Sequence, residues 1–344
     1  SDADNTDSQT DFQIEIATDF SFSNIVCSSA MIKYDTDLID NYTLTETQGL
    51  SNGLYYFRIR VNDGKFDGSS FDGQKFFGPW SSGTDSFYIF PYEGPFWYVS
   101  ADTGLDSNNG SETFPFKTIT KALRSVSSGD TVFVYNGIYS ETVVIDTDNI
   151  SLIGSDSSLT IIDPPGDSLI LSLYGVYCDT QVNLKICNLK VRNCFIGYYF
   201  INIDSSVFEN LSAEYCGGSS GGSGYYFIND CDSNVIQFCQ GFMNYYGFVF
   251  NSKCNNNTIQ YNLNEISTNS GFLISDASDT NIFKNNTVYY SNDGILISNS
   301  VNNLVSENLF SNNTYGIEIV SAGYNNIFSN IVKNSLANGI SIFT

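Results

Sequence analysis

Apolar and polar residues alternate in short stretches from about residue 154 to the end of the chain, and each stretch begins with a glycine. The residues at glycine plus one and plus three are apolar, whereas the residue at plus two varies. Alternation with a period of two is typical of a strand that buries one face. Spacings of 22 to 27 residues between these glycines predict a stacked repeat of β-strands. The glycines are Gly175, Gly197, Gly224, Gly247, Gly271, Gly294, Gly316 and Gly339.

Asparagines follow the same period, as pairs that are five residues apart. If successive coils stack about 4.8 Å apart, like residues lie above one another. A buried asparagine can then donate to one neighbouring coil and accept from the other. We therefore expect asparagine ladders at Asn183, Asn188, Asn257, Asn262, Asn281, Asn286, Asn303, Asn308, Asn325 and Asn330.

The repeated pattern of Gly-Ile-x-Ile followed by Ser-x-x-Asn-x-Ile-x-x-Asn resembles the right-handed parallel β-helix repeats of NosD-type and pectin-lyase-like proteins. The segment that runs from Trp97 to Gly154 is similar to the family's entry module, which has a helix near 115–127 that covers the open end of the solenoid. The resemblance implies an all-β fold, with a β-helix of 22–24-residue coils over residues 96–344. Its two inward columns are the plus-one and plus-three residues, from Tyr198 and Phe200 to Ile340 and Ile342.

Residues 1–92 have a different pattern. Asp11–Ile16, Leu54–Val61 and Ser86–Phe90 alternate as strands, and Asn41–Thr45 is a weaker candidate. The run from Gly53 to Gly64 resembles the later strands of a fibronectin type III domain, which is a β-sandwich of about seven strands. The first strands of such a sandwich are absent from this sequence.

Both ends of the chain therefore look incomplete, because the sequence also stops inside a repeat at Thr344. Two interpretations are open. The chain is a piece of a longer protein, or neighbouring copies complete both ends by strand donation and form a head-to-tail filament.

Composition narrows the choice of partners. The formal net charge is −23, with 14 Lys and Arg against 37 Asp and Glu, which excludes nucleic acid as a plausible partner. There is no run of about 20 apolar residues that could span a membrane. We expect an extracellular or cell-surface location.

Eight cysteines are present. The coil register places Cys194 beside Cys216 and Cys231 beside Cys254 on adjacent coils, which predicts two disulfides. Cys178 and Cys239 are expected in the core, and Cys27 and Cys187 stay unassigned. Glycosylation sequons provide acceptor candidates. Those at Asn109, Asn256, Asn285 and Asn312 fall at predicted turns and are favoured, and Asn41 and Asn149 are further candidates.

The sequence offers few candidates for catalysis. It has no histidine, and Lys253, Lys284 and Lys333 are the only basic residues after Arg192. Lys185, Lys190 and Arg192 could hold a uronate or could be ordinary solvated strand residues. No cofactor is expected, although a structural calcium is possible at Asp276, Asp279 and Asp293, with a weaker candidate at Asp63, Asp67 and Asp72. Ordinary solvated turn carboxylates are the favoured interpretation of both groups.

These observations predict a non-enzymatic extracellular protein with no catalytic site. Its function would be structural or adhesive, as a rod-like subunit that assembles with itself head to tail into a filament or surface layer. Two alternatives use the same fold. One is a carbohydrate-active enzyme, a polysaccharide lyase or hydrolase, which needs a carboxylate or basic cluster in one groove. The other is a glycan-binding module, in which exposed aromatics such as Tyr199 and Tyr226 would contact sugars.

Overall fold

The computed structural model describes residues 11–29, 32–33, 50, 53–62, 80–81, 85–89, 92–166, 172–218 and 221–343. The chain divides into two compact units, residues 1–92 and 93–344. The predicted strand at Asn41–Thr45 and the candidate residues Asn41, Asp63, Asp67 and Asp72 lie outside the described residues.

The N-terminal unit contains an antiparallel sheet with the strand order β2-β1-β4-β5, and β3 pairs with β1. Its core is formed by Ile16, Cys27 and Tyr55. Arg58 on β4 forms an ion pair with Glu15 on β1 (2.6 Å). The sheet is consistent with a small β domain, but a fibronectin type III topology is not shown. The strands are β1 (Asp11–Ala17), β2 (Ile25–Ser28), β3 (Ile32–Lys33), β4 (Gly53–Asn62) and β5 (Asp85–Ile89).

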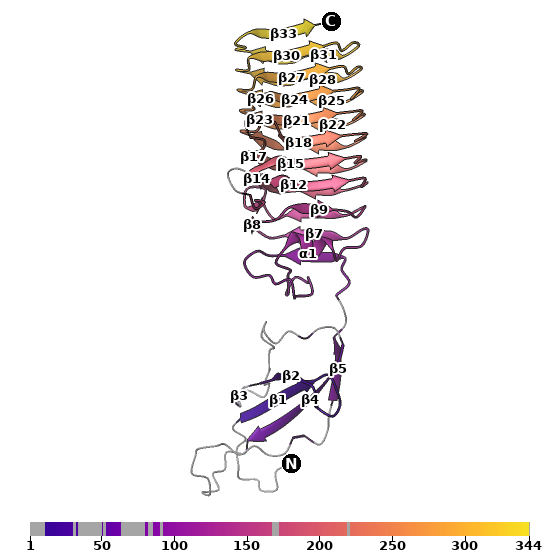
Figure 1. The fold of residues 1–344 in the computed structure, drawn as a ribbon, viewed down its shortest axis with the longest axis vertical. Coiled ribbons are helices and arrows are strands. Elements are labelled where there is room, and N and C mark those ends of the chain that lie inside the picture. Colours follow the sequence, from indigo (N-terminus) through magenta and orange to yellow (C-terminus); the bar gives the residue numbers. More distant parts are fainter. Residues whose placement is uncertain are drawn as a thin grey trace. The chain divides into compact units, whose positions relative to one another are not determined.

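The second unit is a parallel β-solenoid of about nine turns, as the sequence predicts, in which each turn adds one strand to each of three sheets (Figure 1). Strands of the first sheet are β6 (Phe96–Val99), β7 (Thr131–Val134), β10 (Ser151–Gly154), β13 (Lys185–Cys187), β16 (Val207–Glu209), β19 (Val235–Gln237), β22 (Thr258–Gln260), β25 (Ile282–Lys284), β28 (Leu304–Ser306) and β31 (Asn326–Phe328).

The second sheet contains nine strands of three residues each. They are β8 (Gly137–Tyr139), β11 (Thr160–Ile162), β14 (Lys190–Arg192), β17 (Ser212–Glu214), β20 (Gln240–Phe242), β23 (Leu263–Glu265), β26 (Thr287–Tyr289), β29 (Leu309–Ser311) and β32 (Ile331–Lys333).

The third sheet carries the glycine motif and has the longest strands. They are β9 (Val143–Ile145), β12 (Ser172–Asp179), β15 (Cys194–Ile201), β18 (Ser223–Ile228), β21 (Tyr246–Asn251), β24 (Ser270–Ser275), β27 (Asp293–Ser298), β30 (Tyr315–Val320) and β33 (Asn338–Phe343).

The inner columns of the third sheet are continuous stacks of apolar side chains. Tyr225 and Phe248 stack with ring centroids 4.3 Å apart, and Phe227 and Phe250 stack at 4.9 Å. Burying each large side chain contributes about 1.5–3 kcal/mol before the entropy cost is subtracted. Ile340 and Ile342 differ from the prediction, because they are 57% and 66% exposed in β33, beyond which no described coil is stacked.

A helix covers the first turn, but it is shorter than predicted. α1 spans Ile119–Leu123, and its cap Thr118 accepts a hydrogen bond from the Lys121 amide. The chain before it is not helical, because Phe116 pairs with Val99 as a bridge and its ring stacks on Trp97. Burial of Ile119, Ala122 and Leu123 against the first strands closes this end of the core.

The asparagine columns are hydrogen-bonded along the solenoid. In one, Asn257 Nδ2 donates to Asn281 Oδ1 (3.0 Å), and Asn281 Nδ2 donates to Asn303 Oδ1 (3.2 Å) and to the Cys254 carbonyl (2.8 Å). The other column links Asn262, Asn286, Asn308 and Asn330 in the same way. Every rung therefore satisfies buried backbone groups as well as its own amide.

Asn183 and Asn188 do not belong to these buried columns. They lie one residue earlier, in left-handed turn conformations, and the column positions of that coil are occupied by Leu184 and Leu189. Asn183 instead donates to Asn149 Oδ1 (2.9 Å) on the outside. The five-residue spacing is the same in both registers, so the pair spacing alone did not distinguish them.

Candidate functional site

The outer face of the third sheet is shaped by an irregularity at the repeat glycines. In β27, Asp293, Gly294 and Ile295 are all buried, so strict alternation fails there. A Cβ on Gly294 would lie 2.3 Å from the Gly316 carbonyl oxygen and 2.7 Å from Phe310 Cδ1, which explains why this inward corner position is glycine. As a result, the residue before the glycine and the residue two after it share the outer face.

Tyrosines occupy this face in the first coils. Tyr174 stacks on Tyr177 of the same strand, and its ring centroid lies 4.9 Å from that of Tyr199 on the next. Tyr199 stacks in turn on Tyr226 (5.5 Å). We call Tyr174, Tyr177, Tyr199 and Tyr226 the tyrosine ladder. Its rings cover one another's faces, so their edges and hydroxyls, rather than their faces, are available to a ligand.

Burial raises the pKa of Tyr177, Tyr199 and Tyr226, and nearby acidic and phenolic groups raise it further. The hydroxyls therefore stay protonated at neutral pH and can act as hydrogen-bond donors. Tyr177 already contacts Asp179 Oδ2 (3.4 Å) at the end of its strand. This face thus carries several tyrosine hydroxyls close to acidic side chains. Sugar hydroxyls can form hydrogen bonds with both kinds of group.

Two carboxyl groups meet farther along the same face. Glu318 on β30 lies near Asp293 on β27, one coil below, and the two carboxyl groups interact. Burial and the nearby Asp293 raise the pKa of Glu318 above its usual value of 4.5. We call Asp293 and Glu318 the carboxyl pair. Two carboxyl groups so close together are a recurrent arrangement for acid–base catalysis.

The surroundings of the pair distinguish its two members. Asp293 is only 2% exposed, and its two oxygens accept hydrogen bonds from Ser270 Oγ (2.8 Å) and Asn292 Nδ2 (3.1 Å). These two hydrogen bonds fix the orientation of the Asp293 carboxyl group. Glu318 is half-buried and reaches solvent. Glu318 is therefore the member that can present a proton to a ligand, whereas Asp293 holds it in place.

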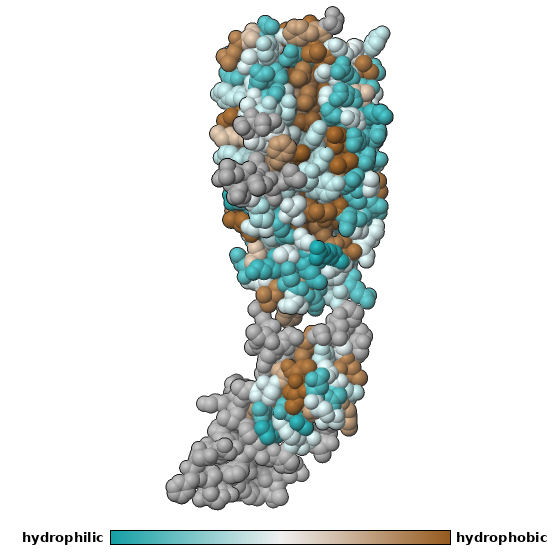
Figure 2. Space-filling view, viewed as in Figure 1, coloured by the Kyte–Doolittle hydropathy of each residue, from teal (hydrophilic) through white to brown (hydrophobic). Residues whose placement is uncertain are grey.

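A polar network connects the pair to the tyrosines. Asn269 Nδ2 donates to the Tyr246 hydroxyl (3.2 Å), and Ser270 Oγ contacts Asn269 Oδ1 (3.2 Å) next to Asp293. On the same strands as the network, the column that continues from Tyr226 carries Val249, which is buried, and the half-buried Leu273 and Leu296. Figure 2 shows apolar side chains gathered over the C-terminal coils. The face therefore changes from tyrosines to aliphatic residues to carboxyl groups along the solenoid.

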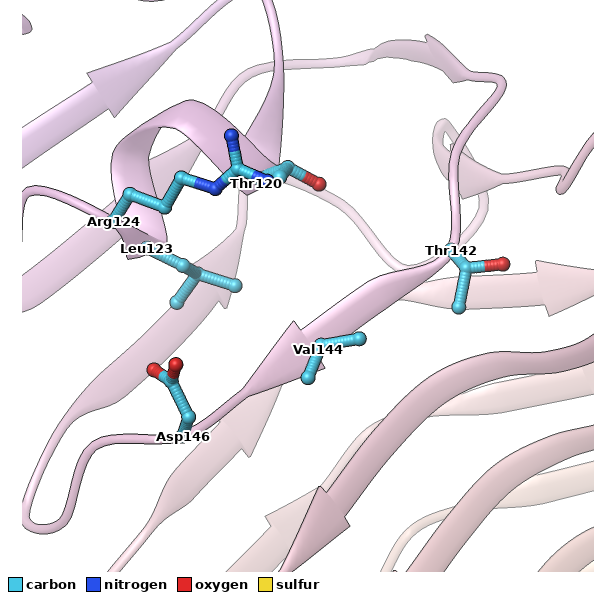
Figure 3. A pocket seen from close by; sticks show the side chains of 6 residues that line it. All are labelled: Thr120, Leu123, Arg124, Thr142, Val144 and Asp146. Carbon is cyan, nitrogen blue, oxygen red and sulfur yellow. The ribbon is translucent and has the colours of Figure 1, made fainter.

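A cavity of about 380 Å³ lies between α1 and β9, at the other end of this sheet (Figure 3). Leu123 and Val144 line its middle, and Arg124 and Asp146 stand on different sides of it. Val144 pairs with Tyr177 of the tyrosine ladder, so the cavity adjoins that ladder. Thr120 and Thr142 complete the lining.

The basic residues singled out from the sequence do not form one site. Lys185 lies on the first sheet, whereas Lys190 and Arg192 lie on the second. Lys190 forms an ion pair with Glu214 (2.7 Å), and Arg192 forms one with Asp163 (2.8 Å). Both cations are paired with acidic side chains, and the three basic residues are not gathered into the uronate site that the sequence left as an alternative.

The calcium candidates are also separated. Asp276 follows the end of β24, whereas Asp293 begins β27, at the opposite end of the sheet. Asp279 Oδ1 is engaged by the amide of Val301 (2.6 Å). Within the described ranges, no three His, Cys, Asp or Glu side chains gather into a metal-binding group.

The cysteine pairs lie side by side as the coil register predicts. Cys194 and Cys216 are buried with their Sγ atoms 3.6 Å apart, and Cys231 and Cys254 are buried in the equivalent turns after β18 and β21. The structure holds all eight cysteines as thiols, so the two disulfides stay a prediction. Cys178 and Cys239 are fully buried, and Cys27 and Cys187 are each 5% exposed.

The glycosylation candidates among the described residues lie in loops and turns. Asn109 is in the loop before α1, while Asn149, Asn256, Asn285 and Asn312 all adopt left-handed turn conformations at the corners. Asn256 is exposed, and Asn285 and Asn312 are half-buried. Their modification stays a prediction.

The architecture defines a parallel β-helix protein. A family model described as "Periplasmic copper-binding protein (NosD)" matches residues 123–341, and the chain belongs to this family. A comparison with curated proteins finds no match. No helix in the described part of the chain is long and apolar enough to cross a membrane.

Solved structures share the fold at low sequence identity. Pectate lyase Pel9A is 15% identical, with a TM-score of 0.55 over 68% of this chain and 72% of that chain. The GH136 lacto-N-biosidase from Eubacterium ramulus is 14% identical, with a TM-score of 0.52 over 68% of this chain and 56% of that chain. These similarities establish the β-helix fold.

The prediction that this chain is not an enzyme is contradicted by these comparisons, since the two solved structures described above, which share its fold, are a lyase and a glycosidase. That prediction was argued from the lack of histidine and the scarcity of basic residues. Glycoside hydrolysis needs neither, because carboxyl groups can supply both acid and base. The sequence argument therefore looked for residue types that this chemistry does not require.

The family description names copper, so the side chains of this protein can be compared with the ligands that copper prefers. Copper prefers imidazole, thiolate and thioether ligands. The sequence has no histidine and two methionines. The thiols that approach one another do so in isolated pairs inside the solenoid, at 0–1% exposure. The described residues do not fit a copper centre, and no chemistry is assigned to one.

Proposed function

We propose that this protein is an exported carbohydrate-active enzyme that binds a polysaccharide along the outer face of the third sheet and cleaves its glycosidic bonds. The single observation that carries the proposal is the carboxyl pair of Asp293 and Glu318 on that face. The periplasmic description of the family supports export. The β-helix neighbours support carbohydrate as the substrate class.

In this proposal Glu318 is the general acid. Its raised pKa keeps a proton available to the oxygen of the departing sugar. Water adds to the anomeric carbon, and the proton that it releases restores the carboxyl pair. Asp293 is a positioning residue that orients Glu318, since its own oxygens face Ser270 and Asn292.

The substrate chain would extend from the carboxyl pair toward the tyrosine ladder. Tyr246, Tyr226 and Tyr199 offer hydroxyl donors along this path, and the cavity beside Val144 lies at its far end. The earlier structural reading, a filament subunit completed by neighbouring copies, receives less support from the comparisons than this alternative. Self-assembly and adhesion stay predictions.

The test is product release from a panel of polygalacturonate, alginate, xylan and β-glucan, measured as new reducing ends and as unsaturated products. Wild type should act on at least one member, and Glu318→Gln should lose at least about 100-fold in rate, which is the lower end of the contribution of a general acid. Glu209→Gln, on the outer face of the first sheet, is the matched control and should retain the wild-type rate. If the wild-type protein binds a polysaccharide but releases no products, the protein is a glycan-binding module and not an enzyme.

A further inference from the structure

A line of exposed apolar side chains runs along the corner between the second and third sheets. Tyr215, Met243, Ile266 and Tyr290 occupy equivalent turn positions on four consecutive coils and are 50%, 43%, 40% and 61% exposed. We call these four residues the corner ridge. The equivalent turn position in the coils on either side is asparagine, at Asn193, Asn312 and Asn334.

Each ridge residue has a left-handed backbone conformation. The φ angles of Tyr215, Met243, Ile266 and Tyr290 are 56°, 53°, 59° and 56°. Asparagine tolerates this conformation, whereas large and β-branched residues are disfavoured in it. The ridge residues are therefore unfavourable for two reasons, since they strain the backbone and expose apolar surface. The same combination occurs at Phe238 and Tyr261 on a different corner, so the strain alone does not mark a site, and the position of the ridge beside the carboxyl pair must be considered with it.

The ridge is continuous with the carboxyl pair. Tyr290 is followed by Ser291 and Asn292, and Asn292 Nδ2 donates to Asp293 Oδ1 (3.1 Å). One coil below, Ile266 precedes Asn269 and Ser270, and these two belong to the network that reaches Tyr246 and Asp293. Two or three residues therefore separate the ridge from the outer face of the third sheet on each of these coils.

We propose that the corner ridge is the apolar docking strip along one edge of the polysaccharide chain, which lies on the neighbouring outer face of the third sheet. This role rests on the function proposed above. A linear polymer fits a strip that is one side chain wide and repeats once per coil. A stable protein partner would need about 800 Å² on each side, which a single file of four half-exposed side chains does not supply. Tyrosine and aliphatic side chains pack against the apolar faces of sugar rings.

The test replaces ridge residues by the asparagine found in neighbouring coils. Met243→Asn and Tyr290→Asn should relieve backbone strain and raise the melting temperature by roughly 2–4 °C each. The same variants should bind the polysaccharide about 10-fold more weakly in affinity gel electrophoresis with the panel above. Tyr261→Asn is the matched control, because Tyr261 has the same conformation (φ 57°) and 49% exposure at a different corner.

Tyr261→Asn should gain stability without losing affinity, and Tyr290→Phe should keep wild-type affinity. Unchanged affinity in Met243→Asn and Tyr290→Asn, together with an inactive Glu318→Gln, would overturn the docking strip and leave the proposed function standing. A wild type that neither binds nor cleaves any member of the panel would overturn both. Equal losses of affinity in all three asparagine variants would also overturn the strip.

Discussion

The two faces of the third sheet are built from the same strands but follow different rules. On the inner face, aromatic and aliphatic residues recur at the same positions in every coil, from Tyr198 to Ile319. On the outer face the residue type changes along the axis, from Tyr177 through Leu273 to Glu318. Repetition on the inner face stabilises the stack, whereas variation on the outer face places different chemistry at different heights.

The largest expected effect is on the inner face. Ile297 is fully buried between Ile274 and Ile319 on the adjacent strands. Ile297→Asp places a carboxylate in an apolar column and should cost more than about 4 kcal/mol, enough to abolish cooperative folding. Leu296→Asp, one residue away on the outer face, should cost far less. Thermal unfolding by circular dichroism compares the two, and similar melting curves would contradict the assigned register.

Next in size are the predicted disulfides, which would fasten adjacent coils. If Cys194–Cys216 and Cys231–Cys254 form in the exported protein, each should stabilise it by about 2–4 kcal/mol. Intact mass without reductant should then be lower by two hydrogens per bridge, and reductant should lower the melting temperature. Labelling of all eight cysteines in unfolded, unreduced native material would refute both bridges.

A smaller loss is expected at one rung of an asparagine ladder. Asn281→Ala removes the acceptor of the Asn257 amide and the donor to the Cys254 carbonyl. The unsatisfied groups should cost about 1–3 kcal/mol. Urea unfolding measures the difference. No change in the free energy of unfolding would mean that the ladder fixes the shape of the turns but contributes little to stability.

The smallest effect is a pH dependence on the outer face. Because the pKa of Glu318 is raised in the folded state, the folded protein binds this proton more tightly than the unfolded chain does. The associated stability is fully present below pH 4.5 and is lost as pH rises through the raised pKa. Glu318→Gln should flatten this part of the stability curve, as measured by melting temperature against pH. An unaltered curve would mean that Glu318 does not carry the shift.

Periodicity explains which parts of the molecule could be predicted from sequence. The inner columns and the asparagine ladders from Asn257 to Asn308 recur in every coil, so a single chain contains several copies of the evidence. The register of the asparagine columns was ambiguous at Asn183 and Asn188. There the turn positions and the buried column positions have the same five-residue spacing. The helix was predicted too long because Phe116 joins the first sheet as a bridge instead.

The carboxyl pair had no comparable signal. Asp293 and Glu318 occupy different positions relative to their glycines, and simple alternation would place them on opposite faces. They meet because two consecutive inward residues, such as Gly294 and Ile295, shift the strand by one residue. The corner ridge was equally invisible, since Met243 and Ile266 read as ordinary apolar residues until their left-handed turns are known.

The most direct test of the account is the rate of product release by wild type and Glu318→Gln across pH. Both proteins are assayed at a temperature well below their melting temperatures, so that each stays folded. The account predicts that wild-type cleavage declines as pH rises through the raised pKa of Glu318 and that Glu318→Gln is inactive throughout. A folded Glu318→Gln variant that cleaves the same polysaccharide at the wild-type rate would contradict the assignment of chemistry to this face.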